Sequence, residues 1–123
     1  MDGCSEIFVN FADSFSIAYF YCNQLIIKDK MFKTNQYFDG KVVSIGLESA
    51  EGTATVGVMQ AGEYEFGTSS MEVMTVISGE LTIQQPGETD WKTYKKFESF
   101  VVAKDVKFKV KCTQDTPYLC LYK

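Results

Sequence analysis

Apolar and polar residues alternate along most of the chain after Gly40. The alternation is clearest over 106–112, where apolar residues stand at the even positions and Lys107, Lys109 and Lys111 at the odd ones. A period of two is typical of a strand with one buried face. We therefore expect the even positions to point inward and the three lysines to point outward.

The same period, interrupted by turn residues, predicts strands through the rest of this region. They are expected over 41–47, 53–59, 63–66, 73–77, 80–84, 91–94, 99–102, 106–112 and 118–122. Ser78 and Gly79 favour a tight hairpin that joins 73–77 to 80–84. Short strands with turn signals at this spacing, and no helical period after Met31, indicate an all-β sandwich or barrel over 31–123.

Residues 1–30 have a different character, with six of the eighteen aromatic residues and a single glycine. Asp2, Glu6 and Asp13 do not fit a secretory signal, which needs a basic start and an uninterrupted apolar stretch. Two interpretations stay open. The segment is translated upstream sequence with Met31 as the functional start, or it is an added strand or helix that covers a sheet edge or a partner.

Composition narrows the chemistry that the chain can perform. All 12 basic residues are lysine, the net charge is −4 and histidine is absent. A chain without arginine or a basic excess is a poor nucleic-acid binder. Without histidine it lacks the commonest metal ligand and the usual general base. No apolar run reaches the roughly 18 residues of a membrane helix, so no membrane partner is expected.

The four cysteines are Cys4, Cys22, Cys112 and Cys120, and no two of them form a CxxC pair. Cys112 and Cys120 flank a turn and either face each other or serve as small apolar core residues; the second interpretation is favoured. Nothing else in the sequence indicates an oxidising compartment. We therefore expect a cytoplasmic protein.

Phe66, Thr68, Glu72 and Gly79 have the spacing of the first cupin motif, in which two histidines and a glutamate bind a metal. Phenylalanine and threonine stand here at the histidine positions, and 103–105 lacks the proline, glycine and histidine of the second motif. The chain thus resembles the cupins, small double-sheet barrels. The resemblance implies a cupin-type jelly-roll barrel that has lost its metal site.

Several longer segments resemble one family more closely, and they occur in its order and spacing at 35–42, 57–59, 62–66, 74–79, 90–91 and 118–120. That family is the small cupin-fold pyrimidine/purine nucleoside phosphorylases of bacteria. The resemblance implies that a nucleoside and inorganic phosphate react to give a free base and a pentose 1-phosphate, with broad base tolerance. It also implies a homodimer, with phosphate as co-substrate and no cofactor or metal.

Glu72 is the candidate catalytic residue. If the cupin register holds, its carboxylate points into the barrel, where it grips the ribose hydroxyls and stabilises the positive charge that develops on the sugar. The alternative is a structural carboxylate at the barrel mouth. Gly67 precedes Thr68, Ser69 and Ser70, and such a segment forms either a phosphate-binding nest of backbone amides or an ordinary turn.

Tyr64, Phe66 and Met74 share the inward parity of Glu72, and Tyr122 is a candidate for the barrel mouth. Aromatic faces and a thioether suit contact with many bases, although plain core packing is the alternative role. A second function also stays open, a non-catalytic cupin that binds a small ligand or dimerises. A metal-dependent cupin enzyme would need coordination by carboxylates alone.

Overall fold

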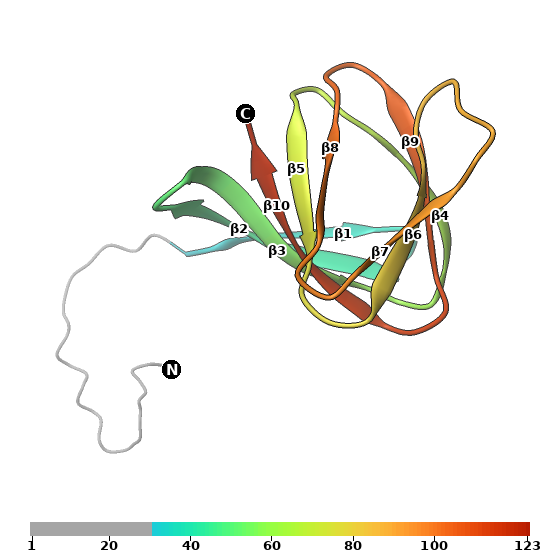
Figure 1. The fold of residues 1–123 in the computed structure, drawn as a ribbon. Coiled ribbons are helices and arrows are strands. Elements are labelled where there is room, and N and C mark those ends of the chain that lie inside the picture. The colour runs from blue at the N-terminus through green and yellow to red at the C-terminus, as the bar shows by residue number, and fades with distance from the viewer. Residues whose placement is uncertain (1–30) are drawn as a thin grey trace, which may run out of the picture. The chain divides into compact units, whose positions relative to one another are not determined.

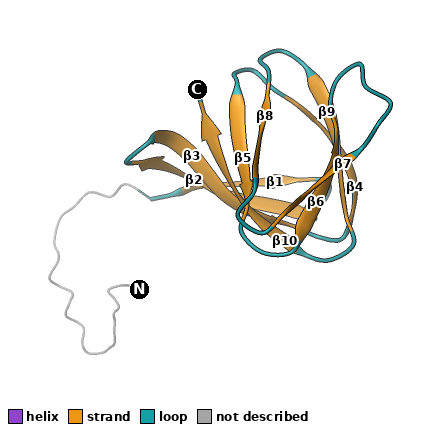
Figure 2. Ribbon diagram, viewed as in Figure 1, coloured by secondary structure: helices purple, strands orange, loops and turns teal. Residues whose placement is uncertain are grey.

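Two antiparallel sheets pack face to face in the computed structural model, which describes residues 31–123. The expectation for the first 30 residues lies outside this range. Within it the chain forms strands and turns without any helix (Figure 2). No helix that could span a membrane occurs in the described part.

The six-stranded sheet has the order β1-β2-β3-β10-β5-β8 and the four-stranded sheet has the order β4-β9-β6-β7 (Figure 1). The strand bounds are β1 Lys33–Tyr37, β2 Val42–Ser49, β3 Gly52–Met59, β4 Gly62–Gly67, β5 Glu72–Val76, β6 Glu80–Gln84, β7 Lys92–Lys95, β8 Ser99–Val102, β9 Lys107–Cys112 and β10 Thr116–Tyr122. The predicted all-β jelly roll is therefore confirmed. It is a sandwich of two separate sheets rather than one continuously hydrogen-bonded barrel.

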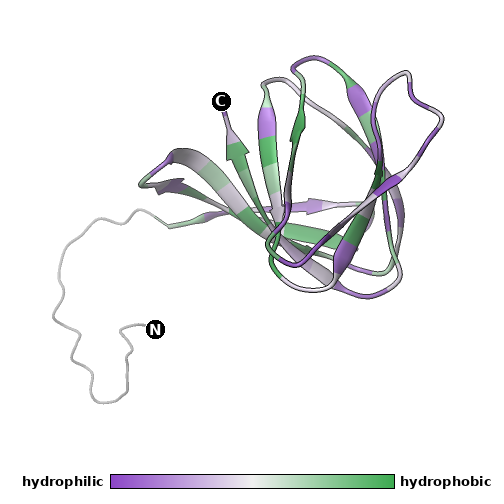
Figure 3. Cartoon of the chain, viewed as in Figure 1, coloured by the Kyte–Doolittle hydropathy of each residue, from purple (hydrophilic) through white to green (hydrophobic). Residues whose placement is uncertain are grey.

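The nine predicted strands all occur, with ends that differ by at most two residues. The alternation over β9 is also confirmed, because Phe108, Val110 and Cys112 are buried and the lysines between them are exposed. Figure 3 shows the same alternation as bands of hydrophobic and hydrophilic residues along the strands. β1 was missed because its residues are polar and mostly exposed on both faces, so burial imposes no period on them.

The predicted hairpin between 73–77 and 80–84 is wrong. Gly79 does adopt the left-handed conformation of a tight turn, with a φ of 77°. However, β5 pairs with β10 and β8, whereas β6 pairs with β9 and β7. The turn therefore carries the chain from one sheet to the other. Turn residues reveal a reversal of the chain but not which strands pair after it.

The outer faces of the two sheets differ in polarity. On the four-stranded sheet Glu63 lies opposite Lys111, and Glu65 lies opposite Lys109. On the six-stranded sheet many exposed residues are apolar, among them Val43, Ile45, Val56, Val58 and Val101. Charged cross-strand pairs keep the first face soluble. The second face leaves apolar surface in water.

Gly57 makes room for a buried ring in the middle of the six-stranded sheet. It lies opposite Ser44 on β2 and Tyr118 on β10. A Cβ atom at this position would stand 2.6 Å from the Tyr118 hydroxyl oxygen and 2.7 Å from Cζ. The ring of Tyr118 therefore lies directly over the glycine, and any side chain there displaces it.

Replacement of Gly57 by alanine is expected to lower the free energy of unfolding by about 1–3 kcal/mol, the usual cost of overpacking a core. Chemical denaturation followed by circular dichroism measures the change. Gly46→Ala is the matched control, because the nearest atom to a Cβ there is 3.8 Å away in the neighbouring strand. Equal stability of the two variants would contradict this account of Gly57.

Candidate functional site

A cavity of about 100 Å³ lies between the two sheets, and we call it the inner cavity. Its buried floor is formed by Met59, Met74, Phe108, Tyr118 and Cys120. The remaining lining residues are partly exposed and therefore mark its mouth: Tyr37, Phe66, Gly67, Glu72 and Tyr122. The mouth thus combines two aromatic rings from β1 and β4 with a carboxylate and a phenol from β5 and β10.

Glu72 supplies the carboxylate that lines the inner cavity. It begins β5, where it lies opposite Tyr122 on β10. The Cys120 thiol donates a hydrogen bond to Glu72 Oε1 at 3.5 Å. Among residues 31–123 no lysine lines the cavity, so none of the lining residues described neutralises this carboxylate.

Burial raises the pKa of Glu72 above its usual value, and the hydrogen bond from Cys120 offsets this only in part. The direction follows from desolvation, which disfavours the charged form of a carboxyl group. Keeping Glu72 ionised therefore costs free energy in the folded protein. A carboxyl group whose pKa is shifted by burial in a cavity is a candidate for a functional site.

The groups around Glu72 are hydrogen-bond donors at neutral pH. Burial raises the pKa of Tyr118 to about 12 and that of Cys120 to about 12, and it also raises the pKa of Tyr122. The thiol and both phenols therefore keep their protons. The Tyr122 hydroxyl lies 3.0 Å from the Thr55 hydroxyl. The cavity thus offers one acceptor and several donors, a set that suits a polyhydroxylated ligand.

Phe66, Glu72, Met74 and Tyr122, four of the predicted site residues, meet in the inner cavity. Tyr64 does not line it, although its ring centroid is 6.2 Å from that of Phe66. The Tyr64 hydroxyl donates to the Gln60 carbonyl at 2.6 Å, so this side chain packs behind the wall.

Of the residues 67–70 in which the sequence predicts a phosphate-binding nest or a turn, only Gly67, the last residue of β4, lines the cavity. Thr68 is buried; its hydroxyl donates to the Ala103 carbonyl at 2.7 Å and accepts from the Val106 N–H at 3.1 Å. Thr68 therefore ties two loops together and has no free hydroxyl hydrogen. Ser69 is exposed and Ser70 half-buried, and neither makes a hydrogen bond within residues 31–123.

Several lining residues escaped the sequence analysis. Tyr118 and Cys120 lie on β10 with the same parity as Tyr122, so the alternation of that strand contained the signal. Tyr37 ends β1, the strand without a burial period. Only the tertiary structure places it at the cavity mouth.

The cupin fold implies a metal site, and the residues at the corresponding positions do not fit one. Phe66 has no ligating atom, and the Thr68 hydroxyl is used by backbone groups. Glu72 remains as a single carboxylate beside a protonated thiol. Among residues 31–123 no three histidine, cysteine, aspartate or glutamate side chains gather as a metal would require.

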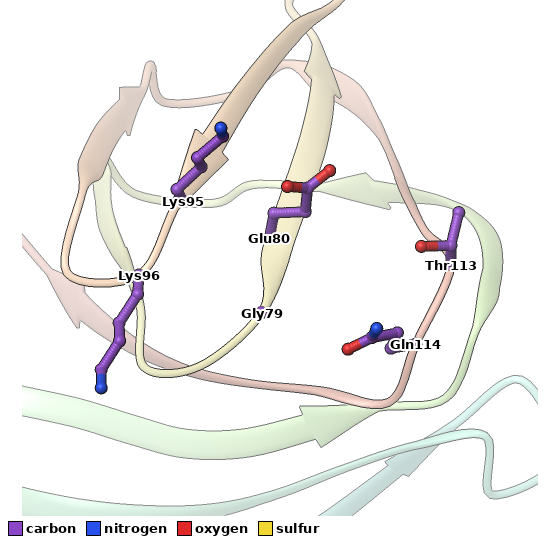
Figure 4. A pocket seen from close by; sticks show the side chains of 6 residues that line it. All are labelled: Gly79, Glu80, Lys95, Lys96, Thr113 and Gln114. Atoms are coloured by element: carbon purple, nitrogen blue, oxygen red, sulfur yellow. The ribbon is translucent and has the colours of Figure 1, made fainter.

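A larger hollow of about 470 Å³ lies elsewhere on the domain, lined by Gly79, Glu80, Lys95, Lys96, Thr113 and Gln114. All six residues are exposed. Figure 4 shows that Lys96 points away from Glu80 and Gln114. Without apolar walls or converging polar groups it is a solvated depression, whereas ligand sites combine the two.

Comparison with known proteins gives the family of this chain. The family model described as pyrimidine/purine nucleoside phosphorylase matches residues 32–122. The chain belongs to this family. A pyrimidine/purine nucleoside phosphorylase of Pseudomonas putida (strain W619) is 55% identical over 93 residues, which cover 76% of this chain and 99% of that protein.

Solved structures show the same fold in other proteins. A protein of unknown function from Vibrio parahaemolyticus is 43% identical with a TM-score of 0.71, covering 74% of this chain and 97% of that one. A cupin domain of an XRE-family transcriptional regulator from Enterobacter cloacae has a TM-score of 0.54 at 16% identity, covering 65% of this chain and 93% of that one. This second likeness shows the fold alone. The resemblance seen in the sequence is thus confirmed for both family and fold.

The variant Glu72→Gln is expected to be more stable than the wild type at pH 7.5. Because the pKa of Glu72 is raised in the folded state, the folded protein binds more protons than the unfolded one. Its free energy of unfolding therefore falls as the pH rises above the unfolded pKa. Glu72→Gln has no carboxyl group at this position and does not lose stability in this way. The difference in stability between the variant and the wild type therefore becomes smaller as the pH falls towards 4.5, the ordinary pKa of a glutamate side chain.

Thermal unfolding of the two proteins between pH 4.5 and 8 measures this difference. Glu51→Gln, at an exposed turn position, controls for the loss of one negative charge. A Glu72→Gln variant that is less stable than the wild type across the whole range would show that the carboxylate is a structural anchor.

Proposed function

We propose that this chain cleaves purine and pyrimidine nucleosides by phosphorolysis, giving the free base and a pentose 1-phosphate. The observation that carries the proposal is Glu72, a partly buried carboxylate set among hydrogen-bond donors in the inner cavity, which no lysine of residues 31–123 lines. Family membership and the name of the Pseudomonas putida relative support the same reaction.

In this reaction the bond between C1′ of the sugar and the base nitrogen breaks, and its electron pair leaves with the base. An oxygen of inorganic phosphate forms the new bond to C1′, and the proton that the phosphate gives up ends on the nitrogen of the free base. Positive charge develops on the sugar ring, as in glycoside hydrolysis. The Glu72 carboxylate stabilises that charge and accepts hydrogen bonds from ribose hydroxyls. Tyr122 and Tyr118 line the same cavity and contact the sugar.

Much of the rate enhancement comes from placing the two reactants in line, which contributes on the order of 7–11 kcal/mol. This matters here because the cavity contains no histidine that would act as a general base. We assign the phosphate to the Ser69–Ser70 segment, which follows Gly67 at the cavity mouth and makes no hydrogen bond within the described residues. Inorganic phosphate is the co-substrate, and we propose no further cofactor.

We also propose a homodimer that forms through the outer face of the six-stranded sheet. Cross-strand partners there form apolar rows, one of which runs through Leu47, Ala54, Leu121, Val73 and Val101. A second row contains Ile45, Val56 and Leu119, and a third Val43 and Val58. No charged residue stands in these rows. In a two-fold dimer the same face of both subunits meets, and an uncharged face can pack against its own copy without repulsion.

The size of this face agrees with a dimer. The ten positions of these rows, about 4.8 Å apart between strands and about 6.8 Å apart along them, cover roughly 330 Å². A typical interface buries about 800 Å² per partner, of which the apolar centre is surrounded by a polar rim. The face thus supplies the centre of such an interface. The free thiols Cys112 and Cys120 fit a reducing compartment, and we propose that the dimer works in the cytoplasm.

Purified protein is expected to release base from uridine and from inosine only when phosphate is present, with pentose 1-phosphate as the second product. The variant Glu72→Gln should lower kcat/KM roughly 10²–10³-fold, as the loss of one transition-state contact does. Chromatographic detection of base and sugar phosphate measures both effects, with Glu51→Gln as the charge control. Nucleoside binding without base release would favour a non-catalytic cupin instead.

The variant Val58→Glu is expected to convert the dimer to a monomer, because it places a charge among the apolar rows of the six-stranded sheet. Sedimentation equilibrium measures the mass. Gln84→Glu places the same carboxylate on the outer face of the four-stranded sheet, opposite Lys109, and should leave the dimer intact. A monomeric wild type, or a dimeric Val58→Glu variant, would rule out this interface.

A further inference from the structure

The turn between β1 and β2 holds an unusual backbone for its residue types. Phe38, Asp39 and Gly40 have consecutive positive φ angles of 54°, 58° and 85°. The left-handed region costs a non-glycine residue about 1–2 kcal/mol and is unusual for a bulky aromatic residue. Strained backbone of this kind persists where the surrounding structure fixes it, often at ligand sites.

Hydrogen bonds lock this turn in place. The Gly40 N–H donates to the Tyr37 carbonyl and the Lys41 N–H to the Phe38 carbonyl, both at 3.2 Å. The Gln60 N–H donates to the Lys41 carbonyl at 2.8 Å and ties the turn to the end of β3. The turn is therefore a rigid support for the two aromatic side chains that it carries.

Those two side chains gather around Phe66, which lines the inner cavity. The Phe38 ring centroid lies 5.4 Å from that of Phe66 and 5.0 Å from that of Tyr64. The Tyr37 ring lies 6.5 Å from Phe66 at an interplanar angle of 86°. Tyr37 lines the cavity and is 47% exposed, so part of its ring is open at the mouth.

The size of the inner cavity shows why the mouth matters. Its volume of about 100 Å³ is below the roughly 300–1,000 Å³ of ordinary ligand pockets. An engineered cavity of about 150 Å³ already fills with one benzene molecule. The inner cavity is therefore too small for a whole nucleoside, and at least one of the two rings has to lie at the mouth.

The chemistry of the walls decides which ring goes where. Glu72 and Tyr122 offer polar groups that match a pentose, whereas Tyr37 and Phe66 offer apolar ring surface. We propose that Tyr37, together with Phe66, forms the wall against which the nucleobase packs, and that Phe38 and the left-handed turn position this wall. The proposal rests on the proposed phosphorolysis and assigns the base to the β1–β2 side of the cavity.

This wall accounts for broad base tolerance in physical terms. Every purine and pyrimidine presents a π face, and stacking does not read the hydrogen-bonding edges of a base. Tyr37 and Phe66 therefore accept both classes. We expect adenine to depend more on the wall than uracil, because the larger base covers more ring surface.

The test compares Tyr37→Ala, Tyr37→Phe and Phe97→Ala with the wild-type full chain. Phe97 is the matched control: it is an exposed phenylalanine with a φ of 68° in another turn, and it does not line the inner cavity. Calorimetric titration measures the binding of adenine and of uracil. Steady-state kinetics with inosine and uridine give KM for nucleoside and for phosphate separately.

Loss of one stacking partner corresponds to about 1–3 kcal/mol, which is roughly a 5- to 150-fold weaker Kd. Tyr37→Ala should show a loss in this range for adenine and a smaller one for uracil. Its KM for nucleoside should rise by a similar factor while its KM for phosphate stays unchanged, a split that general damage to the fold would not produce. Tyr37→Phe should retain the wild-type values within about twofold, because the ring remains.

The outcomes separate this proposal from the proposed function. Phosphorolysis by the wild type with unchanged Kd and KM in Tyr37→Ala would overturn the wall alone. Base binding that weakens in Tyr37→Ala, without any turnover by the wild type, would support the wall and overturn the phosphorylase. A Phe97→Ala variant as weak as Tyr37→Ala would overturn the wall, and a wild type that binds neither base would overturn both.

Discussion

A single carboxylate, half-buried among groups that keep their protons, is the constraint around which this domain is organised. Glu72 lines a cavity that no lysine of residues 31–123 lines, and burial raises its pKa. The Cys120 thiol and the Tyr122 phenol lie beside it on β10. An ionised group in such a place weakens the folded state, so the rest of the sandwich has to be stable enough to hold it.

That stability comes from ordinary β-sandwich packing around the cavity. Inward residues of both sheets form one apolar core, in which Val42, Val76, Leu81, Val102 and Val110 are fully buried. Gly57 shows that the packing of the core and the shape of the cavity depend on the same residues. Its missing side chain leaves the space in which Tyr118 lies, and Tyr118 is both a core residue and part of the cavity floor.

The domain has also lost the chemistry of the fold to which it belongs. Phe66 and Thr68 occupy positions where the cupin motif has metal-binding histidines, and each has acquired another role. Phe66 lines the inner cavity, and the Thr68 hydroxyl joins two loops by a hydrogen bond to the Ala103 carbonyl. Under the proposed phosphorolysis, electrostatic stabilisation and the alignment of two reactants are the means of catalysis.

The sequence by itself determined the all-β architecture and most strand positions, because burial of one sheet face imposes a period of two on the residues. The same parity correctly brought Glu72, Phe66 and Met74 together. It did not reveal that β5 and β6 belong to different sheets, nor that Tyr37 stands at the cavity mouth. Pairing between sheets and the shape of a cavity arise from contacts between distant segments, and such contacts leave no local period in a sequence.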